Sequence, residues 1–103
     1  MAVGSRLAKI DSYRDLRVWR EAMDAAEAVY RASVRAPADW KYALGSQTLR
    51  AAASVPANIA EGYGRDSTGS YTQFLKIARG SLKELESHLI LAQRVGAFPN
   101  GEV

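Results

Sequence analysis

The feature that most constrains the fold is a heptad row of apolar residues in the last third of the chain. Its members recur at spacings of four and three, and they are Tyr71, Leu75, Ala78, Leu82, Leu85, Leu89 and Ala92. This spacing is typical of the contact seam of a left-handed coiled coil and predicts a helix over about residues 67–95. Phe74, Ile77 and Leu91 flank the row, so the apolar face is wider than a two-stranded contact needs. Gly96 follows as the expected glycine just past the helix end.

An earlier segment, about residues 14–35, shows the same helical periodicity. Its apolar stripe consists of Leu16, Trp19, Ala22, Met23, Ala26, Val29 and Tyr30. Ser12 is the expected N-cap, and Asp15 three residues later gives an imperfect capping box. Because the residue before a proline disfavours helical angles, this helix should end before Pro37.

The middle segment is predicted to form a second helix from about residue 41 to residue 62, interrupted at Gly45. Asp39 is its expected N-cap. Trp40 and Tyr42 are expected to anchor the connection by covering the ends of neighbouring helices.

A polar row runs along this second helix at steps of three or four residues. It consists of Arg50, Ser54, Asn58, Glu61 and Arg65. Gly62 and Gly64 close the helix, and we expect positive φ values at both positions. In the loop that follows, Asp66, Ser67 and Thr68 are all competent N-caps for the last helix.

Three such helices with short connections predict an all-α, up-down antiparallel bundle of the four-helix-bundle type, with its last helix missing or truncated. We assign the bundle to residues 12–98, a flexible leader to residues 1–11 and a short tail to residues 99–103. Three helices would leave part of the last apolar face exposed to water. Either a missing helix or another copy of the chain should cover it, so we expect an oligomer.

Composition excludes several kinds of chemistry. The chain has no cysteine and His88 is its only histidine, which argues against thiolate zinc sites and Ser–His catalysis. His88 is expected to be a surface or subunit-contact residue. No apolar run approaches the roughly 20 residues that cross a bilayer. We therefore expect a cytoplasmic protein with no membrane partner, no metal and no cofactor.

Several sequence blocks occur in an order that resembles a known family. They are D-L-R-V-W-R-E-A-M at 15–23, S-Q-T-L-R-A-A at 46–52, S-V-P-A-N-I-A-E-G-Y-G-R at 54–65, F-L-K-I-A-R-G-S at 74–81 and E-L-E at 84–86. On these blocks the chain resembles the four helix bundle protein family over residues 13–98. Members include proteins encoded in intervening sequences of bacterial large-subunit rRNA genes. The accessory variability determinant of diversity-generating retroelements is a relative.

The resemblance implies a small homo-oligomer, described in the family as a ring of five bundles with a basic surface. It also implies a last helix beyond Phe98, where this chain soon stops. In the retroelement branch it implies nucleic acid or a reverse transcriptase as partner. Most members have no established biochemical activity, so the resemblance supports the fold more strongly than the function.

Seven cations are the candidate nucleic-acid-binding residues. They are Arg17, Arg20, Arg50, Arg65, Lys76, Arg79 and Lys83. Along a bundle surface they would neutralise phosphates of RNA or DNA, with little sequence specificity. The net charge of +3 is mild, and the alternative is ordinary solvated helix faces balanced by carboxylates. On that alternative the chain is a protein-binding adaptor without nucleic-acid affinity.

A second set of residues is expected to be structural or to contact another subunit. It consists of Asn58, Glu61, Gly62, Gly80, Ser81, Leu82, Leu85 and Leu89. Arg79 is the expected partner of Glu61, and Gly80 with Ser81 should allow two helices to approach closely. Glu61 has no histidine or second carboxylate beside it in sequence, so we predict a non-enzymatic protein with no catalytic residue.

Overall fold

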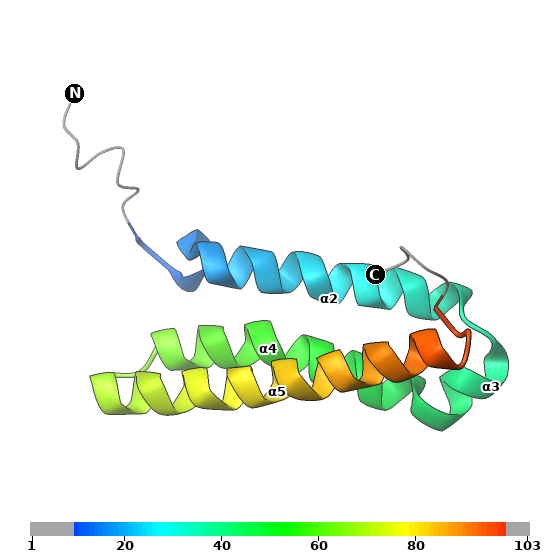
Figure 1. The fold of residues 1–103 in the computed structure, drawn as a ribbon. Helices are drawn as coiled ribbons and strands as arrows, with labels where there is room; N and C mark the ends of the chain where they lie inside the picture. Colours follow the sequence, from blue (N-terminus) through cyan, green and yellow to red (C-terminus); the bar gives the residue numbers. More distant parts are fainter. Residues whose placement is uncertain (1–9, 99–103) are drawn as a thin grey trace.

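The computed structural model describes residues 10–98, and every regular element in this range is helical (Figure 1). In chain order the elements are the 3₁₀-helix η1 (Tyr13–Asp15), α2 (Arg17–Arg35), α3 (Ala38–Trp40), the π-helix η2 (Lys41–Gly45), α4 (Ser46–Tyr63) and α5 (Thr68–Arg94). The all-α prediction is confirmed for these residues, which form three long helices and not four. The predictions for residues 1–9 and 99–103 concern parts of the chain outside the described residues.

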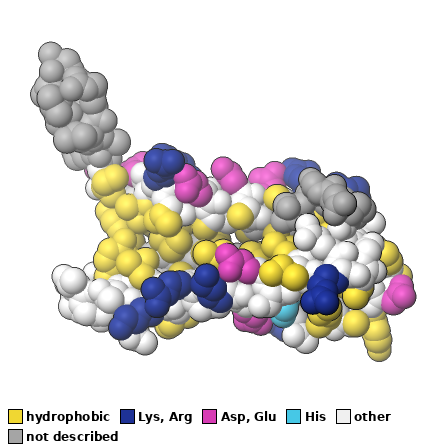
Figure 2. All heavy atoms as spheres, in the orientation of Figure 1, with side chains coloured by type: hydrophobic (Ala, Val, Ile, Leu, Met, Phe, Trp, Pro, Cys, Tyr) yellow, Lys and Arg dark blue, Asp and Glu magenta, His cyan; other side chains and the backbone are white. Residues whose placement is uncertain are grey.

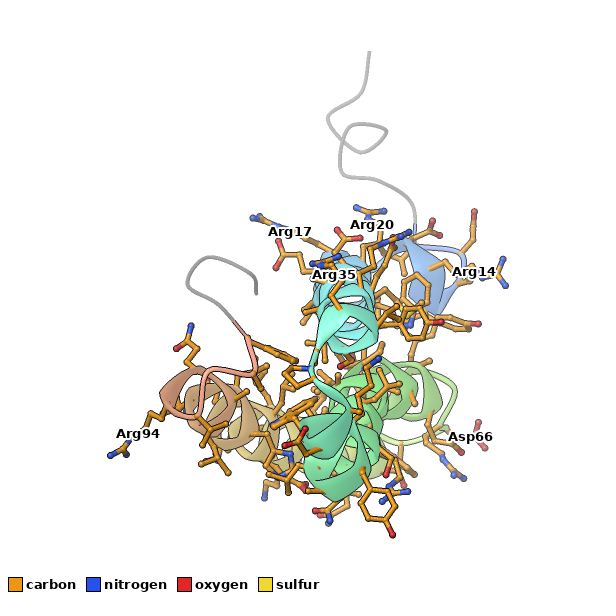
Figure 3. The ribbon with its side chains drawn as sticks, turned by 90° about the vertical axis from the view of Figure 1, so that its right-hand side faces the viewer. Arg14, Arg17, Arg20, Arg35, Asp66 and Arg94 are labelled. Atoms are coloured by element: carbon orange, nitrogen blue, oxygen red, sulfur yellow. The ribbon has the colours of Figure 1, made fainter. Side chains whose placement is uncertain are left out.

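The three long helices run up, down and up, as predicted. Figure 1 shows α2 antiparallel to α4 and parallel to α5, and Figure 3, seen from the end of the bundle, shows one helix at each corner of a triangle. α4 packs along both α2 and α5. The molecule measures 52 × 32 × 17 Å.

Small side chains dominate the core, which consists of three clusters along the bundle. The cluster nearest α3 contains Ala32, Ala36, Trp40, Ala92, Ala97 and Phe98. The middle cluster contains Val29, Ala51, Ala52 and Leu85. The third contains Val55, Ile59 and Ala78, with Leu16, Trp19 and Ala22 packed against it. Residues of α2 and α5 meet in each cluster, which ties these two helices together.

The heptad row of α5 is only partly covered. Ala78, Leu85 and Ala92 are buried. Leu75 and Leu82 are 36% and 41% exposed. Figure 2 shows hydrophobic side chains in the band between α2 and α5. The expected uncovered apolar stripe is therefore present in the described structure.

The start of the first helix differs in detail from the prediction. Ser12 and Asp15 form a complete capping box, but it caps η1. Leu16 then adopts an extended conformation, and α2 begins only at Arg17.

The connection between α2 and α4 corrects two predictions. Asp39 is not an N-cap, because Pro37 precedes α3 and Asp39 lies inside that helix. Trp40 is buried and packs against the tilted ring of Phe98 with ring centroids 4.7 Å apart, as an anchor should. Tyr42, in contrast, is 95% exposed and covers no helix end. The expected interruption at Gly45 is a π-helical turn.

The glycines at the C-terminal end of α4 correct a third prediction. Within residues 10–98 the only glycine with a positive φ is Gly96, at 79°. Gly64 has a φ of −80°. Gly62 is required for a different reason: a Cβ there would lie 2.8 Å from Phe74 Cβ and 3.0 Å from Tyr71 Cδ1. It therefore allows the close crossing of α4 and α5.

Candidate nucleic-acid interface

The seven candidate cations do not form one patch. They fall into three groups, on the outer side of α2, on α5 and along the polar row of α4. Arg17 and Arg20 point away from α4 and α5 (Figure 3). Arg17 Nε donates to Glu21 Oε2 at 2.7 Å. This hydrogen bond, and then the charge of Glu21, raises the pKa of the Arg17 guanidinium above its ordinary value.

The α5 group is a row of Lys76, Arg79 and Lys83, all exposed. Steps of three and four residues place these side chains on one face of the helix. Figure 2 shows Lys and Arg side chains following one another along α5. Lys83 Nζ lies 3.5 Å from Glu86 Oε1, whereas Lys76 and Arg79 form no ion pair within residues 10–98. We call these three residues the α5 cation row.

The α4 group is divided between two environments. Arg65 Nη2 bonds to Glu61 Oε2 at 2.7 Å, and the guanidinium lies 4.8 Å from the centre of the Phe74 ring. The predicted bond between Glu61 and Arg79 is therefore wrong. This i,i+4 pair across the C-terminal end of α4 needs no packing between helices, and it satisfies Glu61 locally. Arg50 lines a pocket between α4 and α5 and forms no ion pair among the described residues.

Part of the set expected to be structural does join α4 to α5. Asn58 Nδ2 donates to Ser54 O at 2.8 Å and to Ser54 Oγ at 2.9 Å. Ser54 Oγ in turn lies 2.8 Å from Ser81 Oγ on α5. The sequence indicated Asn58 and Ser81 but not the Ser54–Ser81 contact, because a helical pattern does not reveal which rows of two helices face each other.

The remaining members of this set differ in their surroundings. Leu85 is buried and Leu89 is half-buried, both within the core of the single chain. A Cβ on Gly80 would meet no atom within 4 Å. The expected close helix approach at Gly80 is therefore wrong within the chain. Contact of Gly80 or the exposed Leu82 with another subunit stays a prediction.

His88 is half-buried and joins α5 to α4. Its Nδ1 lies 3.2 Å from Thr48 Oγ1, which itself donates to Leu44 O at 3.0 Å. Nδ1 is the donor to Thr48 in the tautomer in which the Thr48 hydroxyl donates to Leu44 O. Its Nε2 lies 3.9 Å from Glu84 Oε2. The expected role at a surface or subunit contact was thus incomplete, since His88 supports the packing of α4 on α5.

No group of three or more potential metal ligands occurs within residues 10–98. Across the same range, no helix has the length and apolar character needed to cross a bilayer.

Fold and surface together define a small all-α bundle with a basic row on its last helix and incompletely covered apolar faces. The chain belongs to the 23S rRNA-intervening sequence protein family, whose model matches residues 14–103. The resemblance drawn from its sequence blocks is thereby confirmed. No curated protein shows a significant match to the chain.

Proposed function

We propose that the chain is a non-enzymatic, oligomeric helical-bundle protein that binds nucleic acid through the α5 cation row with little sequence specificity. The observation that carries this proposal is the row itself. Lys76 and Arg79 are exposed cations with no carboxylate partner within residues 10–98, and Lys83 continues the same face. Cations already paired with carboxylates would lose those contacts on binding phosphate, whereas unpaired ones lose only water.

The dimensions of the row suit a phosphate backbone. Lys76 and Lys83 are seven residues apart, or about 10 Å along the helix axis. Phosphates of one strand in duplex DNA are separated by about 3.4 Å along its axis, so one row can engage a few phosphates. Such a contact is weak on its own. An oligomer would repeat the row and raise the affinity by binding several segments of one nucleic acid at once.

Exposed apolar surface supports self-association. Besides Leu75 and Leu82 on α5, a groove of about 570 Å³ runs between α2 and α4. It is lined by Tyr13, Trp19, Met23, Ala26, Glu27, Ala53, Pro56, Ala57 and Ala60. Contact with other copies, in a ring as the family resemblance implies, would remove these surfaces from water. If the chain is instead a protein-binding adaptor, the same groove holds a helix of another protein. A reverse transcriptase is one candidate for that partner.

The test replaces Lys76, Arg79 and Lys83 together with glutamine. For the unchanged protein, the logarithm of affinity for duplex RNA or DNA should fall nearly linearly with the logarithm of salt concentration. The triple variant should bind more weakly and with a flatter slope, as measured by fluorescence anisotropy. The matched control replaces Arg14, Arg17 and Arg20, which removes the same charge from the other side of the molecule (Figure 3).

Equal losses in the two triple variants would show that only total charge matters and would contradict the role of the α5 row. If the unchanged oligomer binds neither nucleic acid at about 50 mM salt, where screening is weak, the adaptor function is favoured.

A further inference from the structure

A polar pocket lies between α4 and α5, apart from the apolar groove. Its volume is about 290 Å³, and no residue of α2 lines it. The lining residues are Gln47, Arg50, Ala51, Ser54, Ser81 and Glu84. Five of the six are polar or charged, and Gln47, Arg50 and Glu84 are exposed, so the pocket is open to solvent along the outer edge of the two helices.

The serines in this lining have an unused hydroxyl proton. Ser54 Oγ accepts from Asn58 and lies 2.8 Å from Ser81 Oγ. The two hydroxyls carry two protons, and the bond between them uses one. The other proton forms no hydrogen bond within residues 10–98. The pocket therefore offers one hydroxyl donor from its inner wall.

Opposite charges in the same lining restrict what can bind. Arg50 forms no ion pair among the described residues, and Glu84 there has only His88 Nε2 nearby, at 3.9 Å from Oε2. A phosphate would be repelled by Glu84 and a divalent cation by Arg50. A neutral, flat group that presents hydrogen-bond donors beside an acceptor satisfies both side chains.

We infer that this pocket binds the Watson–Crick edge of an unpaired guanine, an inference that rests on the nucleic-acid binding proposed above. Guanine N1–H and N2–H are parallel donors that the two oxygens of the Glu84 carboxylate accept together. Guanine O6, next to them, accepts from Arg50 or from the serine hydroxyl. No other standard base offers two adjacent N–H donors on this edge. The edge is accessible only in single-stranded segments, which is where proteins read RNA sequence.

A path joins the pocket to the α5 cation row. At 3.6 residues per turn, Gly80 lies between Lys76 and Glu84 around the circumference of α5. Gly80 is exposed, and a Cβ there would meet no atom within 4 Å. A strand whose phosphates contact the cation row can therefore pass over bare backbone and place one base in the pocket. Guanine preference in unpaired segments is thus added to a backbone contact that is otherwise indifferent to sequence.

The test uses short single-stranded oligoadenylate RNAs with one central guanine, inosine or adenine. Inosine keeps O6 and N1–H but lacks the 2-amino group, so it removes one donor to Glu84. The guanine strand should bind about 10-fold more tightly than the adenine strand, the size typical of one good bidentate contact, with inosine between them. Glu84→Gln should abolish the difference between guanine and inosine, because an amide has only one acceptor oxygen.

Asp24→Asn is the matched control, since it removes the same charge on α2 and touches neither the pocket nor an ion pair among the described residues. It should retain the guanine preference, and circular dichroism should show both variants equally helical. Equal binding of guanine and inosine strands by the unchanged protein would overturn the guanine site while leaving backbone binding intact. Absence of binding to every strand at about 50 mM salt would instead overturn the proposed function on which the site rests.

Discussion

Gly62 and Gly80 are the same residue type on neighbouring helices, yet they meet opposite surroundings. At Gly62 an added Cβ would collide with Phe74 Cβ at 2.8 Å, whereas at Gly80 it would project into open space. We expect Gly62→Ala to destabilise the protein by about 1–3 kcal/mol through overpacking. Gly80→Ala should stabilise it by about 0.5–1 kcal/mol, because alanine restricts the unfolded chain.

Urea denaturation followed by circular dichroism measures both free energies of unfolding. Shifts of the same sign and size in the two variants would contradict the close crossing of α4 and α5 at Gly62. The contrast also illustrates what sequence reasoning misses at this scale: both glycines were expected to be structural, and only the contact with α5 distinguishes them.

At the scale of elements, periodicity located the helices well and their ends less well. The sequence predicts helices over 14–35, 41–62 and 67–95, and the structure has α2, α4 and α5 at 17–35, 46–63 and 68–94. Residues 14–15 of the first predicted helix belong to η1, and residues 41–45 of the second belong to η2. The 3₁₀ turn of η1 is tighter than an α-helix and the π turn of η2 is wider. Over a few residues each gives the same apolar spacing as an α-helix, so the sequence pattern cannot distinguish them.

The start of α5 offers a test at this scale, because three adjacent residues could cap it. The structure selects Ser67, whose side chain accepts from Ser70 N at 3.1 Å. Ser67→Ala should therefore lower the free energy of unfolding by about 0.5–2 kcal/mol. Asp66→Ala and Thr68→Ala are the controls and should have smaller effects in thermal denaturation. A larger loss with either control would place the cap at that residue instead.

For the whole molecule, the sequence predicted the composition of the basic surface but not its layout. The rotation of each helix about its axis decides which cations share a face, and local carboxylates decide which are neutralised. Arg17 and Arg65 form i,i+4 pairs, whereas Lys76 and Arg79 do not. The pocket that includes Arg50 and Glu84 was not predicted, because it needs two helices in a particular register.

In the proposed function, the affinity of the whole molecule for nucleic acid depends on self-association. Leu75 and Leu82 are seven residues apart on α5 and partly exposed, so their replacement by glutamine removes apolar surface at modest cost to the core. We expect the double variant to have a lower mass than the unchanged protein in light scattering at equal micromolar concentration, with helicity retained. Tyr42→Gln is the control, because Tyr42 is almost fully exposed at η2.

Loss of assembly should also change binding, because a single bundle presents one α5 cation row. The double variant should therefore bind nucleic acid more weakly and with a smaller salt slope, although every cation is still present. An unchanged slope in a dissociated variant would mean that one bundle makes all the phosphate contacts. A monodisperse monomer formed by the unchanged protein would remove the oligomer from the proposed function altogether, and the exposed leucines would then favour a different protein as the partner.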